Sequence, residues 1–118
     1  MAELLYWVAL YCLFSILIET PILLIGLSAR HTLRVRLFAG VWLTSCTYPI
    51  VGIVLPALFD NRVLYLAVAE TFAPVAECVL FWLAFGNRAE WGRPSMWRDF
   101  AAIVTANLAS FLIGEVFL

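Results

Sequence analysis

The chain has 118 residues, of which 65% belong to the hydrophobic set and 13% are charged, and its formal net charge is −1. Soluble domains are typically about 45 to 50% apolar and about 25% charged, so this composition excludes an ordinary water-soluble fold and predicts a membrane protein. Because positive charge is not in excess, nothing in the sequence points to a nucleic-acid partner.

Four apolar segments follow one another along the chain, at about 4–27, 37–59, 63–85 and 100–118. Each has the roughly 20 residues that a helix needs to cross the hydrocarbon core of a bilayer. The connections between them are too short to form a water-soluble domain. We therefore expect an all-α fold: one integral membrane domain over residues 1–118, with four transmembrane helices in an up-down bundle.

The first two segments each combine a polar residue with a proline. Glu19 is followed by Pro21, and Thr47 is followed by Pro49. An acidic side chain at mid-membrane costs about 2.5 to 3.5 kcal/mol on insertion scales, so it normally faces a bundle interior or a wet cavity. Proline removes a backbone hydrogen bond, so we expect a kink at both prolines; the alternative is that they only shape the packing.

The third segment carries two acids on one face, and the fourth carries an amide and a hydroxyl. Glu70 and Glu77 are seven residues apart, with Pro74 between them as a third expected kink. Residues spaced by three, four or seven lie on one side of a helix, so these three form one stripe. In the last segment Asn107 and Ser110 lie on one face for the same reason, and such residues make interhelical hydrogen bonds possible.

Depth along each segment separates the acids into levels. At about 1.5 Å per residue from the outer end, Glu70 lies about 10 Å deep, whereas Glu19 and Glu77 lie about 21 to 22 Å deep. We expect the four polar faces to converge on a common interior. The residues of this predicted polar pathway are Glu19, Glu70, Glu77, Thr47, Asn107 and Ser110.

The arginines predict the orientation. Only Arg62 lies in the second connection, whereas the first and third connections hold the other six of the chain: Arg30, Arg34, Arg36, Arg88, Arg93 and Arg98. Positively charged connections stay on the cytoplasmic side, so we expect both termini outside and these arginines at the lipid headgroups. His31, within the same arginine-rich connection, is expected to be solvated or to face headgroups.

The two halves of the chain share a spacing. Glu19 precedes Arg30 by eleven residues, and Glu77 precedes Arg88 by eleven. Both halves also run from outside to inside and back, which is consistent with a parallel repeat of two helical hairpins, as in some transporters. Chance similarity between apolar segments is the alternative explanation.

Four segments resemble a pattern in an uncharacterised family of small four-helix bacterial inner-membrane proteins: IETPILLIGL, LTSCTYPIVGIVLP, LAVAETFAPVAECVLFWLAF and RDFAAIVTANLASFLIG. The pattern places Glu before Pro in the first helix, Thr-His-Pro in the second, two Glu seven residues apart in the third, and Asn three residues before Ser in the fourth. The resemblance covers most of the chain and implies the bacterial inner (cytoplasmic) membrane, but no reaction.

Where the pattern has His, this chain has Tyr48. Tyrosine is a poorer ligand than imidazole for ordinary divalent ions, which argues against a metal site of His and Glu and leaves any metal unknown.

Three classes of function remain open. A proton- or cation-conducting channel or transporter would use Glu19 and Glu77 as an inner relay and Glu70 as an outer one. A non-catalytic structural or accessory subunit of a larger membrane complex would use the same side chains for packing. An enzyme is the least supported, because no nucleophile with a base, metal cluster or Gly-rich phosphate loop is present. We expect no catalytic residue and no cofactor, and as partners membrane lipids with further copies of the chain or another membrane subunit.

Overall fold

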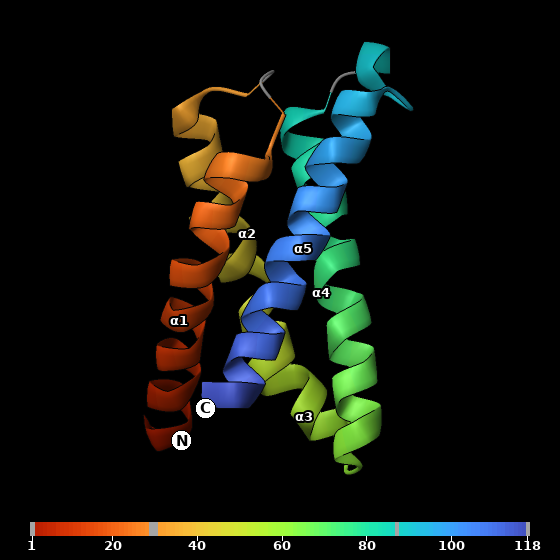
Figure 1. The fold of residues 1–118 in the computed structure, drawn as a ribbon. Coiled ribbons are helices and arrows are strands. Elements are labelled where there is room, and N and C mark those ends of the chain that lie inside the picture. Colours follow the sequence, from red (N-terminus) through yellow and green to blue (C-terminus); the bar gives the residue numbers. More distant parts are fainter. Residues whose placement is uncertain (1, 29–30, 87, 118) are drawn as a thin grey trace.

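Four long apolar helices make up most of the computed structural model, which describes residues 2–28, 31–86 and 88–117 (Figure 1). The first is α1, Ala2–Gly26. The second span consists of α2, Leu33–Pro49, a π-helix, Ile50–Val54, and α3, Leu55–Leu58. The third and fourth are α4, Arg62–Phe85, and α5, Pro94–Phe117. Each span is long and apolar enough to cross a membrane, so the predicted all-helical fold with four such helices is confirmed.

All four spans begin earlier than the apolar segments indicate, and the second and the last do so by four and six residues. The second begins at Leu33 rather than at 37, because the Thr32 hydroxyl accepts a hydrogen bond of 3.3 Å from the Val35 N–H and caps the helix. The last begins at Pro94 rather than at 100, and proline favours the first turn of a helix. Hydropathy marks the part of a helix that fits hydrocarbon, whereas the caps determine where the helix begins.

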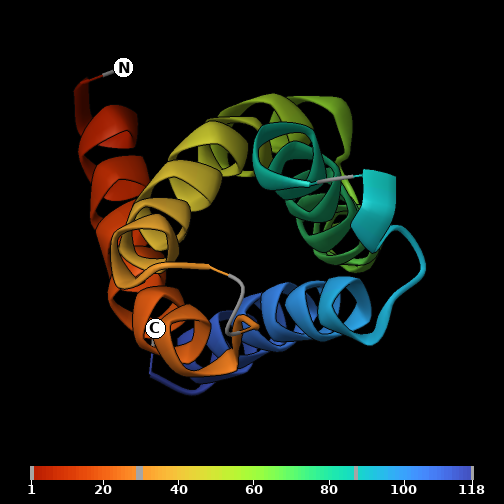
Figure 2. The same cartoon turned by 90° about the horizontal axis from the view of Figure 1, so that it is seen from above.

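The four spans form a ring (Figure 2). Both α2 and α5 pack against α1 and against α4, so α1 and α4 lie on opposite sides of the ring. Both termini and the connection at 59–61 lie at one end, which we call the terminal end (Figure 1). The connections from α1 to α2 and from α4 to α5 lie at the other end, the arginine end. The longest dimension is 44 Å, close to the full thickness of a bilayer with its headgroups.

Small residues allow close helix contacts toward the arginine end. A Cβ atom at Gly40 of α2 would overlap the Thr20 side chain of α1, and one at Gly26 would lie 2.9 Å from the Ala102 side chain of α5. An apolar core fills this half of the ring: Leu23, Leu27, Ala39, Leu43, Phe81, Ala102, Ile103 and Ala106. In lipid, helices associate mainly through close van der Waals packing of this kind, because the hydrophobic effect does not act between them there.

The second span departs from α-helical geometry near its end. In the π-helix the Leu55 N–H bonds to the Ile50 carbonyl, five residues earlier. In that register the Val51 carbonyl would pair with Pro56, which has no N–H. The Tyr65 hydroxyl of α4 donates to the Val51 oxygen instead, at 2.8 Å. This bond fastens the end of the second span to α4.

The predicted proline kinks differ from one another in the structure. The π-helix begins directly after Pro49, so helix type changes there. By contrast, α1 and α4 remain α-helical through Pro21 and Pro74. Neighbouring groups can accommodate the missing backbone bond without a change of helix type.

Candidate functional site

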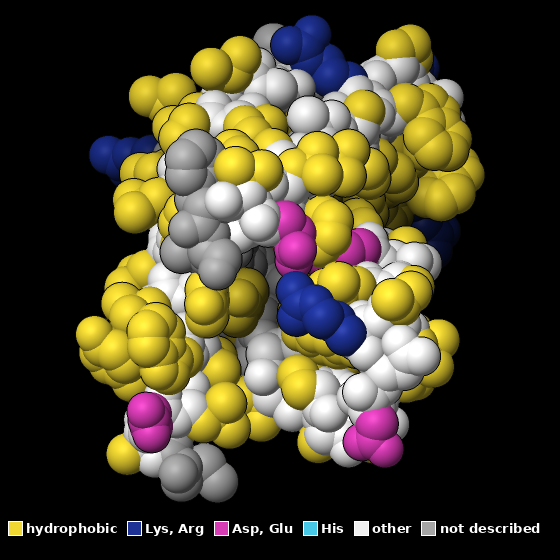
Figure 3. Space-filling model, turned by 60° about the horizontal axis from the view of Figure 1, so that its bottom comes forward, with side chains coloured by type: hydrophobic (Ala, Val, Ile, Leu, Met, Phe, Trp, Pro, Cys, Tyr) yellow, Lys and Arg dark blue, Asp and Glu magenta, His cyan; other side chains and the backbone are white. Residues whose placement is uncertain are grey.

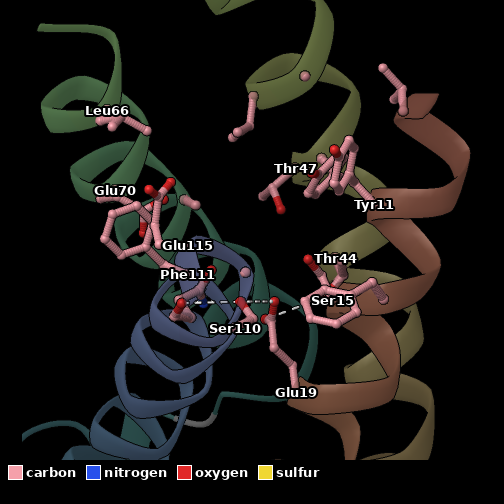
Figure 4. A pocket seen from close by; sticks show the side chains of 18 of the residues that line it. Tyr11, Ser15, Glu19, Thr44, Thr47, Leu66, Glu70, Ser110, Phe111 and Glu115 are labelled. Atoms are coloured by element: carbon pink, nitrogen blue, oxygen red, sulfur yellow. Dashed lines mark hydrogen bonds between the residues drawn. The ribbon is translucent and has the colours of Figure 1, made fainter. Parts of the chain in front are cut away.

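A cavity of about 440 Å³ lies between the four spans in the half of the ring nearer the termini (Figure 4). Its charged lining consists of four carboxyl groups and one guanidinium: Glu19, Glu70, Glu77, Glu115 and Arg62. Pockets that hold small molecules typically measure about 300 to 1,000 Å³. The cavity therefore has the size of a small-molecule site and an excess of acidic groups.

Glu19 of α1 lies at the bottom of this cavity and is only 3% exposed. The Ser110 hydroxyl of α5 donates to Glu19 Oε2 at 2.9 Å, and the Thr44 hydroxyl of α2 donates to Oε1 at 3.4 Å. Figure 4 draws Glu19 reaching toward Ser110 across the ring. Donors from both neighbouring helices thus hold this carboxyl group.

Glu77 of α4 occupies the opposite side of the cavity bottom and is 2% exposed. The Thr47 hydroxyl of α2 donates to Glu77 Oε2 at 3.0 Å, and Asn107 of α5 also faces this carboxyl group. The carboxyl groups of Glu19 and Glu77 interact electrostatically across the ring. We call the two acids and their four polar neighbours the glutamate floor: Glu19, Glu77, Thr44, Thr47, Asn107 and Ser110.

Two hydroxyls of the floor have a choice of acceptor. Thr47 Oγ1 lies 3.1 Å from the Leu43 carbonyl oxygen, and Ser110 Oγ lies 3.1 Å from that of Asn107, in addition to their glutamates. A hydroxyl has one hydrogen and donates one such bond at a time. Each can therefore bond its own helix when the carboxyl group binds something else. Each hydroxyl therefore still has an acceptor after its glutamate oxygen is released.

Glu70 differs from the two acids of the floor. It is half-buried, lines the cavity nearer the termini, and has no hydrogen bond or ion pair with any residue that the structure describes. At the mouth of the cavity, Arg62 Nη2 lies 3.2 Å from Glu115 Oε1 in an exposed ion pair. The guanidinium is thus matched with another acid, and Glu70 is left without a counter-charge.

Aromatic side chains form much of the cavity wall above the floor: Trp7, Tyr11, Phe14, Tyr48, Tyr65 and Phe111. They come from all four spans, and Figure 4 shows Tyr11 of α1 and Phe111 of α5 on different sides of the space. Figure 3, with the terminal end forward, shows acidic side chains in the middle of a mostly hydrophobic face. The cavity thus combines aromatic walls with acidic groups.

All six residues of the predicted polar pathway line this one cavity. Five belong to the glutamate floor, and Glu70 lies nearer the mouth. Thr44 was not predicted, although its spacing of three residues from Thr47 matches that of Asn107 and Ser110. Among the described residues, no group of three or more His, Cys, Asp or Glu is placed to hold a metal ion.

The expectation that His31 is solvated or faces headgroups is wrong. His31 is 7% exposed, and its Nε2 lies 2.8 Å from Oδ2 of Asp99, which is 1% exposed. The Ser28 N–H donates to the other Asp99 oxygen at 2.7 Å, and the imidazole meets the Phe81 ring edge-on. Ser28 and His31 lie against α5 at the arginine end because that helix begins early enough to include Asp99.

Two of the predicted headgroup arginines also cap a helix. Arg36 donates to the carbonyl oxygens of residues 24, 28 and 31 at 2.8 to 3.2 Å, and Arg98 donates to that of Gly26 at 3.0 Å. Cations at this position satisfy the last carbonyls of α1 and oppose its dipole. Arg34, Arg88 and Arg93 are exposed, and Arg30 lies outside the described residues.

No protein-family model, curated protein or solved structure matches this chain. The resemblance to small four-helix bacterial inner-membrane proteins therefore stays a prediction. What the chain does is inferred from its cavity and side chains.

Proposed function

We propose that the chain is an integral membrane protein that takes up a proton or a cation into the cavity and moves it by way of the glutamate floor. The charge balance of the cavity is the main support. Four carboxyl groups face one guanidinium, and that guanidinium is paired with Glu115. Burying an acid in the interior of a membrane protein costs free energy, so such acids normally serve helix packing or a pathway for ions.

We infer an up-down bundle with its arginine end on the cytoplasmic side of the bacterial inner membrane. The positions of six of the seven arginines support this orientation. The many apolar side chains exposed on the outer surface of the bundle support insertion into a bilayer in either orientation. In this orientation both termini lie outside, the cavity opens outward, and the glutamate floor lies near the middle of the membrane.

A route through the cavity would begin at Glu70, which has no partner to displace within the described part of the chain. It would continue to Glu19 and Glu77, whose hydroxyl donors can return to their own helices. Beyond the floor the ring is closed by side chains that are each at most 1% exposed: Leu23, Leu43, Phe81 and Ile103. Passage to the arginine end therefore requires a second conformation in which these side chains separate, and the present one is open outward.

Flux into liposomes tests the proposal. Purified protein in liposomes should carry a proton or monovalent-cation current that Glu77→Gln reduces to the level of empty liposomes. Glu3→Gln is the matched control, because Glu3 is exposed in the first turn of α1 and does not line the cavity. If wild-type protein gives no flux under gradients of protons, sodium, potassium or an organic ammonium ion, transport is wrong.

Orientation can be tested separately with a cysteine at Asp60, which is exposed at the terminal end. The three native cysteines, Cys12, Cys46 and Cys78, are unpaired and would be replaced by serine first. A membrane-impermeant maleimide should label Asp60→Cys in intact cells. Labelling only after lysis would reverse the proposed orientation.

A second candidate is an accessory subunit of a larger membrane complex. The apolar side chains beneath the floor favour it, because the carboxyl groups are hydrogen-bonded and buried apolar side chains lie next to them toward the arginine end. Purification in mild detergent distinguishes the accessory subunit from the transporter. A stoichiometric, unrelated membrane protein at every step favours the subunit, whereas a stable homo-oligomer favours transport.

A further inference from the structure

We propose that the ligand of the cavity is an organic cation, an amine or quaternary ammonium with an apolar body, rather than a bare metal ion. This inference rests on the proposed function, since both use the same cavity, and it names the chemical class of what binds there. Three independent features support it: the volume, the aromatic walls and the distribution of charge.

The volume is far larger than a bare ion needs. A water molecule has a share of about 30 Å³ in the liquid, so a cavity of about 440 Å³ accommodates a ligand of many atoms. Metal sites instead bring several ligands to one point, about 2 to 2.6 Å from the ion. Within the described part of the chain, no group of three or more His, Cys, Asp or Glu side chains is placed to hold a metal ion.

The walls suit a cation that carries apolar groups. Six aromatic side chains surround the space, and Trp7 and Tyr11 lie next to each other with ring centroids 6.1 Å apart. Ring faces attract ammonium groups, and quaternary ammonium ligands are often held in cages of such rings. Aliphatic side chains at Val8, Val51 and Leu66 complete the wall and would contact the apolar body.

The positions of the acidic groups predict the orientation of the bound ligand. Glu70 has no counter-charge among the described residues and lies beside the aromatic wall, so an ammonium group can pair with it on entering. The acids of the floor lie deeper in the cavity. When an ammonium group binds Glu77, the Thr47 hydroxyl can donate to the Leu43 carbonyl oxygen instead of to Glu77. The ammonium end therefore points to the acids, and the apolar body occupies the space between the rings.

Binding of a defined probe tests this. Full-length protein in detergent is dialysed against radiolabelled benzyltrimethylammonium, with potassium chloride, magnesium chloride or neutral benzyl alcohol as competitors. We expect saturable binding that tetraethylammonium displaces and that the other three do not displace at the same concentration. Absence of saturable binding, or equal displacement by potassium or benzyl alcohol, would overturn the inference without any variant being made.

Matched variants then locate the site. Glu70→Gln and Glu77→Gln should each weaken binding about tenfold, because each removes a charge that faces the ligand. Tyr48→Leu should weaken it about 3- to 10-fold, and Tyr48→Phe should not, because the ring is retained. Glu3→Gln and Phe38→Leu change the same residue types outside the cavity and should leave binding unchanged. Equal effects at cavity and control positions would contradict the proposed site.

Binding and flux together separate this inference from the proposed function. If Glu77-dependent proton or potassium flux is observed but the probe does not bind, the inference of an organic ligand is wrong and the proposal of transport is supported. Probe binding without any flux supports the ligand class and contradicts transport.

Discussion

The two ends of the bundle use buried acids in opposite ways. At the arginine end, Asp99 is paired with His31 and bonded to the Ser28 N–H, within a half that is filled by apolar side chains. Toward the termini, Glu70 has no hydrogen-bond or ion-pair partner among the residues that the structure describes, and Glu77 is held by hydroxyl and amide groups at the edge of a cavity. Burial alone therefore does not distinguish an acid that stabilises the fold from one that is available to a ligand. Whether the acid already has a counter-charge is more informative.

The largest effect should come from breaking the buried pair at the arginine end. Asp99→Ala leaves His31 buried without its partner, and removal of one member of such a pair costs about 3 to 5 kcal/mol. The free energy of unfolding in detergent micelles, followed by circular dichroism, measures this loss. His31→Ala combined with Asp99→Ala should cost clearly less than the sum of the single changes. Simple additivity would show that the two side chains do not stabilise each other.

A smaller effect should come from the close contact between α1 and α2. Gly40→Ala places a Cβ against Thr20, and overpacking of this kind costs about 1 to 3 kcal/mol. Gly114→Ala is the control near the cavity, because its Cβ would lie 3.8 Å from Phe14, an ordinary contact. The control should keep or slightly raise the unfolding free energy in the same micelles, since alanine favours helix. Equal losses at both positions would show that the Gly40 contact is not special.

Removal of the bond between Tyr65 and the π-helix should have a modest effect. Tyr65→Phe deletes the donor to Val51 and should cost about 0.6 to 1 kcal/mol. Amide hydrogen exchange should also become faster at Leu58 and Phe59, near the end of the second span. Tyr6→Phe alters an exposed tyrosine and should change neither measurement. Unchanged exchange in Tyr65→Phe would mean that this bond does not hold the span.

The smallest effect on stability should come from Glu77, the acid on which the proposed transport depends. Glu77→Gln keeps an oxygen that can accept from Thr47, so unfolding free energy should change by no more than about 0.6 kcal/mol, the average worth of an interhelical hydrogen bond in a membrane. Flux and probe binding should nevertheless fall. A loss of stability as large as that of Asp99→Ala would make Glu77 structural and would favour the accessory subunit.

Periodicity was sufficient to predict most of the floor. Residues such as Glu70 and Glu77, or Asn107 and Ser110, share a face at fixed helical spacing, and an acid in an apolar segment stands out in any sequence. Hydropathy likewise identified four spans. Helix ends were less accurate because a cap such as Thr32 acts outside the apolar segment.

Contacts between distant residues could not be predicted in the same way. His31 and Asp99 are 68 residues apart, and their pairing depends on how the first connection folds against α5. The bond from Tyr65 to Val51 depends on a π-helical register, and Pro49 and Pro56 on either side of it do not by themselves specify that register. The cavity depends on the packing of all four spans, and no local pattern encodes a volume.

The crossed hydrogen bonds of the glutamate floor also bear on how the protein assembles. Glu19 belongs to the hairpin of α1 and α2 but accepts a bond from Ser110 of the other hairpin, and Glu77 accepts one from Thr47 in return. Neither hairpin can satisfy its acid fully by itself. During assembly the acid of the first hairpin therefore gains its last donor only when the second hairpin packs against it. Two halves made as separate chains, divided at 59–61, should find each other in one membrane through the same exchange.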